Sequence, residues 1–385
     1  MDRLKIMSQV QLRALLLPHA AYLDSRGVRL PPIEDGEIDL VMLSGVLMNP
    51  DENMPPRLVD ALYLINEMAT DEGMDALIEE VHQSGRTLVA GASATPADVA
   101  VEVWLKWPDL LDRKHAENLI TRPRSFEYFL GRADAPRKVP PDDFARRGAL
   151  EKQLDDWFDD NRRGRGCRVL RFDRDAKVWF LVRHGMPVKR EGSMKDGKPD
   201  SVFYRPEKHD VVVYDTERDE LGINASGKKE KELYCQAFGD HLFGNVDHFP
   251  GENKYTLDPL KEHGANALVC SDVDGLEDVT LVELWFFHGG GYDDIEIRKA
   301  SDVFAAMAAR GRSISRMARL PRAVFSVKFA SAPRPRRFTV RPPNITQYTR
   351  DEDSELIELW MLKRGFIRPL LMDSDATANK TVASA

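Results

Sequence analysis

The sequence predicts an α+β fold with an acidic helical N-terminal domain, a central mostly antiparallel β domain and a basic α/β C-terminal region. Three observations lead to this prediction. Apolar residues recur at helical spacing through the first 130 residues, and short alternating runs begin at Cys167. The charge also reverses along the chain: residues 1–100 carry seven basic and sixteen acidic side chains, whereas residues 298–341 carry twelve basic side chains and one acid.

Length and composition indicate a folded protein of several domains. The chain has 385 residues, of which 42% are hydrophobic and 31% charged, so a packed globule is expected. A segment with three prolines, Arg132–Asp143, predicts a linker. The predicted divisions are 1–131 for the acidic helical domain, 132–143 for the linker, 144–300 for the β-rich domain with packing helices, 301–371 for the basic region and 372–385 for a disordered tail.

Several classes of protein are not expected. No apolar run approaches the roughly 20 residues of a membrane helix, so no membrane association is predicted. The N-terminal residues carry scattered charges and no small-residue cleavage pattern, and we therefore expect a cytoplasmic protein. The widely spaced Cys167, Cys235 and Cys270 are expected to be buried free thiols, because they match neither a disulfide framework nor a zinc motif.

Helices are predicted along the N-terminal domain. Thr95 followed by Pro96 gives the clearest start, since threonine suits an N-cap and proline suits the first helical position. That helix is expected to reach Trp107, and another to end near Leu119. Apolar spacing predicts the earlier helices at Gln9–Leu23, Glu37–Leu47, Pro56–Ala69 and Met74–Gln83.

The central region is predicted to be a helix followed by an antiparallel meander. Phe144–Asp160 is the helix, and Lys229–Leu242 is a second helix that packs on the sheet. Alternating apolar and polar residues predict strands in the runs CRVLRF, KVWFLVRHG, VFYRP, DVVVYD and ELGINA, and later at Thr280–Phe287 and Ile295–Arg298. Glycines between the last two runs predict a hairpin turn.

The basic region is predicted to mix helices and strands. Ser301–Ala309 begins with a helix-start signal, and Ala323–Phe329 and Phe338–Arg341 alternate as strands do. Ser354–Lys363 is amphipathic and is followed by Gly365, a common residue after a helix end. This last helix belongs either to a small winged-helix unit beside the arginines or to a cap on the sheet.

Two short motifs have possible catalytic meaning. Arg183-His184-Gly185 resembles the RHG signature of histidine phosphatases, in which the histidine is phosphorylated. The resemblance covers about eight residues. In that family the motif lies at the first strand of an α/β domain, whereas here the flanking runs predict antiparallel strands and no helix start follows Gly185, so we interpret it as a hairpin turn. His288-Gly-Gly-Gly resembles an esterase oxyanion loop, but the chain has no G-x-S-x-G nucleophile, and a hairpin turn is expected there too.

Metal chemistry is the alternative function that the sequence leaves open. Asp240-His241 and Asp247-His248 offer ligand types for a divalent ion, without a recognised spacing. Asp278 and Glu296, on either side of the glycine hairpin, together resemble an incomplete nuclease acid pair. Asp210 and Asp215, which precede Glu220 without a lysine two residues after it, give a similar incomplete fit. Because each pattern lacks a partner, no cofactor, metal or catalytic residue is assigned, and the protein is expected not to be an enzyme.

The basic stretch from Arg298 to Arg341 is the strongest functional signal. Ten of its twelve basic residues are arginine, whose planar fork suits paired contacts with phosphate. The predicted nucleic-acid-binding residues are Arg310, Arg312, Arg316, Arg319, Arg322, Lys328, Arg334, Arg336, Arg337 and Arg341.

These residues predict a protein that binds the backbone of DNA or RNA, as a non-catalytic subunit of a bacterial nucleic-acid-handling assembly. The alternatives are a metal-dependent hydrolase or nuclease with its site in the central β domain, and a protein-interaction scaffold. The acidic N-terminal domain suggests a further partner, either another protein or a second copy of the chain.

Overall fold

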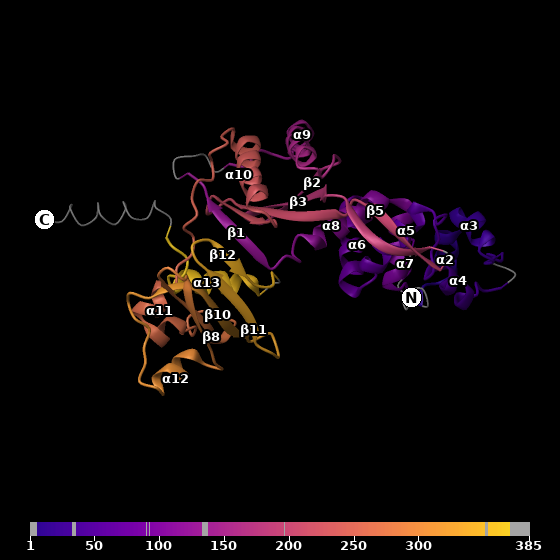
Figure 1. Ribbon diagram of the computed structural model, residues 1–385. Coiled ribbons are helices and arrows are strands. Elements are labelled where there is room, and N and C mark those ends of the chain that lie inside the picture. The colour runs from indigo at the N-terminus through magenta and orange to yellow at the C-terminus, as the bar shows by residue number, and fades with distance from the viewer. Residues whose placement is uncertain are drawn as a thin grey trace. The chain divides into compact units, whose positions relative to one another are not determined.

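The computed structural model describes residues 6–32, 36–89, 91, 93–132, 138–195, 197–350 and 353–369. The chain divides into two compact units, Met1–Asn118 and Leu119–Ala385 (Figure 1). Helices dominate the first unit, and a ten-stranded antiparallel sheet dominates the second. The predicted α+β class is therefore confirmed. Among the described residues, no helix combines the length and apolar character needed to cross a membrane.

The first unit is built from short helices around a continuous apolar core. The helices are α2 (Gln9–Leu16), a 3₁₀ turn η1 (Leu17–His19), α3 (Ala20–Ser25), α4 (Leu40–Leu47), α5 (Pro56–Met68), α6 (Asp71–Gln83), α7 (Pro96–Lys106) and α8 (Pro108–Leu119). Pro18 divides the predicted helix Gln9–Leu23, because proline has no backbone N–H to donate. Thr95 and Asp98 form a capping box at the start of α7, which confirms the predicted start.

The second unit contains one long sheet. Its strands lie in the order β2-β3-β6-β7-β1-β12-β11-β10-β8-β9, and every neighbouring pair is antiparallel. The strands are β1 (Ser125–Leu130), β2 (Arg168–Arg174), β3 (Lys177–Gly185), β6 (Glu207–Asp215), β7 (Glu220–Asn224), β8 (Leu276–Gly289), β9 (Asp294–Lys299), β10 (Arg319–Phe329), β11 (Arg336–Arg341) and β12 (Ile345–Gln347). The predicted glycine hairpin joins β8 to β9.

The register defines two faces of this sheet. One row of cross-strand partners runs through Phe180, Val212, Ile223, Glu127, Ile345 and Arg341. We call the face that carries this row face 1. Because side chains alternate along a strand, the neighbours Trp179, Val213 and Val340 lie on the opposite face, face 2.

Helices cover opposite faces in the two halves of the sheet. In the half from β2 to β1, α9 (Phe144–Asp160) and α10 (Lys228–Phe243) lie over the sheet (Figure 1) and bury face 1. There Phe180 contacts Phe238 at 4.8 Å between ring centres. In the half from β12 to β9, α13 (Ser354–Lys363) covers face 2, where Trp360 packs on Phe325 and Phe338. This contact fits the interpretation of the last helix as a cap on the sheet.

The remaining elements are short. They are α11 (Asp258–Glu262), the 3₁₀ turn η3 (Gly264–Leu268) and α12 (Val303–Ala308), together with a separate two-stranded hairpin, β4 (Lys189–Lys195) and β5 (Lys198–Tyr204). The strands β1, β4 and β12 were not predicted. Residues 125–130 were expected within a helical domain, but they form the strand that pairs with both β7 and β12.

The structure divides the chain between Asn118 and Leu119, whereas the prediction placed the end of the helical domain at residue 131. The sheet continues from the predicted central domain into the basic region because β10 pairs with β8. Of the predicted linker 132–143, residues 133–137 lie outside the described residues, as does the tail 372–385.

Candidate functional site

The ten predicted nucleic-acid-binding residues all belong to the second unit. Strand β10 carries Arg319, Arg322 and Lys328, and β11 carries Arg336, Arg337 and Arg341. The segment between α12 and β10 carries Arg310, Arg312 and Arg316, and the turn between β10 and β11 carries Arg334.

Strand alternation sorts the six strand residues between the two faces. Arg341 lies on face 1, and so does Arg337, four residues earlier on β11. On β10, Arg322 and Lys328 also lie on face 1, and a β-bulge returns Arg319 to it. We call these five residues the basic face. Arg336 pairs with Val327 and points to face 2.

The structure also separates the ten residues by their acidic partners. Three have one: Arg322 lies 3.9 Å from Glu283, Lys328 lies 3.2 Å from Glu277, and Arg336 lies 3.4 Å from Asp353. Within the described part of the chain no acidic partner exists for the other seven, which are Arg310, Arg312, Arg316, Arg319, Arg334, Arg337 and Arg341. No acid in that part of the chain neutralises their charges.

A small cavity lies beside two of these arginines. It has a volume of about 360 Å³ and is bounded by β9 and α12. Its charged lining residues are Glu296, Arg298, Lys299, Arg310 and Arg312. The one acid, Glu296, is already held by Arg298 at 2.8 Å, so positive charge exceeds negative charge around the cavity. Such a site suits a phosphate group.

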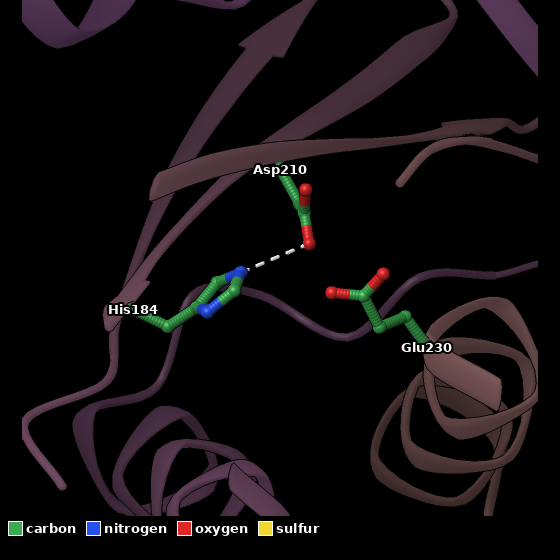
Figure 2. A group of neighbouring side chains, drawn as sticks. All are labelled: His184, Asp210 and Glu230. Atoms are coloured by element: carbon green, nitrogen blue, oxygen red, sulfur yellow. Dashed lines mark hydrogen bonds and ion pairs between the residues drawn. The ribbon is translucent and has the colours of Figure 1, made fainter. Parts of the chain in front are cut away.

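A second candidate site is a buried group of three side chains, His184 of β3, Asp210 of β6 and Glu230 of α10 (Figure 2). We call it the histidine cluster. One ligand atom of each residue lies within 4.8 Å of the others, and His184 Nε2 lies 3.0 Å from Asp210 Oδ2. One imidazole and two carboxylates are suitable ligands for a divalent metal.

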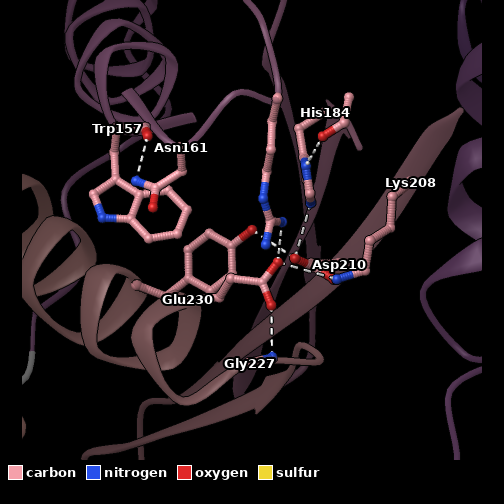
Figure 3. Close-up of polar contacts among 10 residues, drawn as sticks. Trp157, Asn161, His184, Lys208, Asp210, Gly227 and Glu230 are labelled. Atoms are coloured by element: carbon pink, nitrogen blue, oxygen red, sulfur yellow. Dashed lines mark hydrogen bonds and ion pairs between the residues drawn. The ribbon is translucent and has the colours of Figure 1, made fainter. Parts of the chain in front are cut away.

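Two cations already neutralise the carboxylates of the histidine cluster (Figure 3). The Arg163 guanidinium donates to Glu230, and Lys208 Nζ lies 2.8 Å from Asp210 Oδ1 and 3.2 Å from Glu230 Oε1. A divalent ion would add two positive charges to a buried site that is already balanced, which is unfavourable. The contacts therefore favour an internal ion-pair network.

The contacts of the imidazole agree with this interpretation. His184 Nδ1 lies 2.9 Å from the Gly185 carbonyl oxygen and Nε2 lies 3.0 Å from Asp210 Oδ2, so both ring nitrogens already have a partner within the fold. Burial alone would raise the pKa of Asp210, but the His184 hydrogen bond and the Lys208 charge lower it below its ordinary value.

The expected hairpin turn at Arg183-His184-Gly185 is wrong. These residues end β3 and pair in register with β6, from Arg183 opposite His209 to Gly185 opposite Glu207. The apolar alternation that begins at Val178 continues through His184, and the buried imidazole stacks on Phe158 at 4.1 Å. The glycine in the motif is therefore part of the strand.

A larger cavity of about 1050 Å³ lies against face 2, between β3, β6 and β7 on one side and α13 on the other. Two of its lysines are paired with acids that also line the cavity. Lys254 is 2% exposed and donates to Glu220, while Lys177 lies 3.2 Å from Glu358. Burial alone would raise the pKa of Glu358, but the charges of Lys177 and Lys254 lower it to about 2.

The acids and Asp-His pairs that the sequence suggested are arranged differently. In the strand register, Asp278 lies opposite Lys328 and Glu296 lies opposite Phe286, so the two acids are eight positions apart along β8. Asp215 and Glu220 do lie opposite each other on β6 and β7. In the two Asp-His sequences, each histidine contacts a residue distant in sequence: His241 contacts Gln153, and His248 contacts Asp219.

Comparison with protein-family models and with curated proteins finds no match to this chain. Function is therefore argued from the geometry. The sequence did not indicate the histidine cluster, because its members come from three elements that are separated along the chain. Nor did it indicate the paired state of Arg322, Lys328 and Arg336, although the alternation of β11 separates Arg336 from Arg337.

Proposed function

We propose that this protein binds nucleic acid through its sugar-phosphate backbone, using the basic face and the adjacent loop arginines. One observation carries the proposal: seven of the ten predicted residues have no acidic partner among the described residues. An arginine kept for stability is expected to be paired within the fold, as Arg336 is with Asp353. Unpaired arginines in neighbouring strands and loops fit the repeated charges of a phosphate backbone.

In this proposal the protein contacts the sugar-phosphate backbone and does not recognise the base sequence. Guanidinium groups form paired hydrogen bonds to phosphate oxygens, and no groove-reading helix motif accompanies them in the sequence. Membership of a larger assembly belongs to the same proposal. It rests on the opposite charges of the two ends of the chain, which offer one surface to a polyanion and another to a basic partner.

The test is the salt dependence of binding, measured by fluorescence anisotropy with labelled single strands and duplexes. If about six arginines neutralise phosphates, log affinity should fall with log salt with a slope of roughly −4 to −5, shallower for single strands than for duplex. The triple variant Arg334→Gln, Arg337→Gln, Arg341→Gln should reduce the size of the slope by about one unit for each phosphate that is no longer neutralised.

A charge-matched control separates direct phosphate binding from net charge. Arg29→Gln, Arg57→Gln, Arg86→Gln removes the same charge from the acidic unit and should leave the slope unchanged. The proposal fails if wild-type protein binds no nucleic acid at low salt, or if the two triple variants behave alike. In that case the basic face is a protein-docking surface, and the acidic unit is the first ligand to try.

A metal-dependent hydrolase is the second candidate, supported by the 4.8 Å grouping of ligand atoms in the histidine cluster. The test is cleavage of labelled DNA and RNA in Mg²⁺ or Mn²⁺. Because Arg163 and Lys208 balance the carboxylates, we expect no cleavage. Cleavage that is abolished in His184→Ala and retained in Asp278→Ala would establish the hydrolase. The second variant is the control, since Asp278 lies on β8, away from the cluster.

A further inference from the structure

Face 1 carries aromatic as well as charged side chains where it ends at β8 and β9. Trp285 and Phe287 alternate on β8, and neither ring is fully buried. Opposite them on β9 are Ile297 and Ile295, which are 44% and 45% exposed. Large apolar side chains on one open strand pair form a patch that normally has a partner.

Each of these two rings is paired with an arginine from β10. The Arg322 guanidinium lies 5.1 Å from the centre of the Trp285 ring, and the Arg319 guanidinium lies 4.9 Å from that of Phe287. The register explains both contacts, because Arg322 is opposite Trp285 and the β-bulge brings Arg319 opposite Phe287. Two aromatic-arginine stacks therefore lie side by side on an open sheet.

The spacing of the stacks suits splayed bases. Residues two apart on a strand are separated by about 7 Å along it, which leaves room for one flat ring to enter on each stack. Aromatic rings and guanidinium planes are the surfaces on which unpaired bases stack, whereas a duplex hides the base faces. Arg337 and Arg341 lie on the same face of the sheet and supply positive charge for the phosphates.

We propose that this part of face 1, made of Trp285, Phe287, Arg319 and Arg322, is a stacking platform for single-stranded nucleic acid. The inference rests on the proposed function and narrows it from any phosphate backbone to strands with unpaired bases. The stacking needs a base and a phosphate but no 2′-hydroxyl, so single-stranded DNA is a sufficient probe.

The experiment compares three probes of equal length: a 12-nucleotide thymidine strand, a 12-unit abasic deoxyribose-phosphate strand, and a 12-base-pair duplex. Affinity is measured by anisotropy at fixed salt. Wild-type protein should bind the thymidine strand more tightly than the abasic strand, because only the former has rings to stack. Trp285→Leu and Phe287→Leu should each weaken thymidine binding by roughly tenfold and leave abasic binding within about twofold of wild type.

Two controls make the result specific. Trp285→Phe keeps an aromatic ring and should retain most of the affinity, which also shows that the site tolerates substitution. Tyr292→Leu removes an aromatic ring that is 98% exposed in the β8–β9 turn, without an arginine stacked on it in the described residues, and should have no effect.

The outcomes distinguish this inference from the proposed function. If wild type binds the thymidine and abasic strands equally, or if the leucine variants weaken both to the same degree, the platform is wrong and backbone binding stands. Equal weakening of duplex and thymidine binding in the leucine variants also overturns the platform. If wild type binds none of the probes at low salt, the proposed function fails and the platform fails with it.

Discussion

The two halves of face 1 differ in the exposure of their side chains. From β2 to β1, these side chains are mostly apolar and lie under α9 and α10, whereas from β11 to β9 they include the exposed Arg319, Arg337 and Arg341. A single row of cross-strand partners joins Phe180 in the first half to Arg341 in the second. The same alternation therefore builds a core in one half and an open charged surface in the other.

Charged residues also differ between the two halves. In the first half, Lys208 and Arg163 contact buried carboxylates inside the fold. In the second, Arg337 and Arg341 have no acidic partner among the described residues. In the proposed function, the binding surface is therefore distinguished by arginines that the fold does not already pair, and not by the number of positive charges.

The largest expected effect is on the free energy of unfolding, when one aromatic ring is removed from either half of face 1 in two separate variants. Phe180 is 3% exposed and packs on Phe238, so Phe180→Ala should lower the free energy of unfolding by about 3–5 kcal/mol. Phe287 is only partly buried, and Phe287→Ala should cost about 1 kcal/mol or less. Urea denaturation followed by circular dichroism measures both. Similar destabilisation of the two variants would contradict the view that only one half of this face is a core.

An intermediate effect on stability is expected from the change of pH, through the Glu358 carboxylate and the lysines beside it. The pKa of Glu358 is lowered to about 2 in the folded protein from an ordinary value of 4.5. Because the folded value is the lower one, the stabilisation is complete above the unfolded value and is lost as pH falls from about 4.5 toward 2.

Glu358→Gln should therefore cost on the order of 3 kcal/mol at pH 7, and about half as much at pH 3. Urea midpoints of wild type and variant at both pH values give this difference. Arg341 has no acidic partner among the described residues, so Arg341→Gln serves as the control and should show no such pH dependence. A Glu358→Gln effect that is the same at pH 3 and pH 7 would count against stabilisation of the Glu358 carboxylate by Lys177 and Lys254.

Local signals in the sequence were enough to predict much of the fold. The caps and apolar spacing gave α7 and α9, and alternation gave β3, β6 and β10. These elements form from interactions between near neighbours, so their residues carry the signal.

Elements and sites that depend on distant partners were not predictable in this way. Strand β12 has three residues and is held by β1 and β11, which lie on either side of it in the sheet. The histidine cluster requires β3, β6 and α10 to meet, and none of these segments specifies the others. The basic stretch was visible as composition, but the ion pair between Arg336 and Asp353 depends on tertiary packing.

The smallest expected effect, and the sharpest comparison, concerns the neighbours Arg336 and Arg337. They are adjacent in sequence and identical in charge, but Arg337 lies on face 1, whereas Arg336 lies on face 2 near Asp353. If binding followed net charge alone, Arg336→Gln and Arg337→Gln would weaken it equally. If binding depends on direct contact with the backbone, Arg337→Gln should reduce the size of the salt slope by about 0.7–0.9 unit and Arg336→Gln should hardly change it.

Anisotropy titrations at four or more salt concentrations resolve this difference. Neither change should unfold the protein, because both side chains are at least partly exposed. Equal slopes for the two variants would mean that the alternation of β11 does not decide which arginines meet phosphate, and the binding surface would then have to be sought among the loop residues Arg310, Arg312 and Arg316.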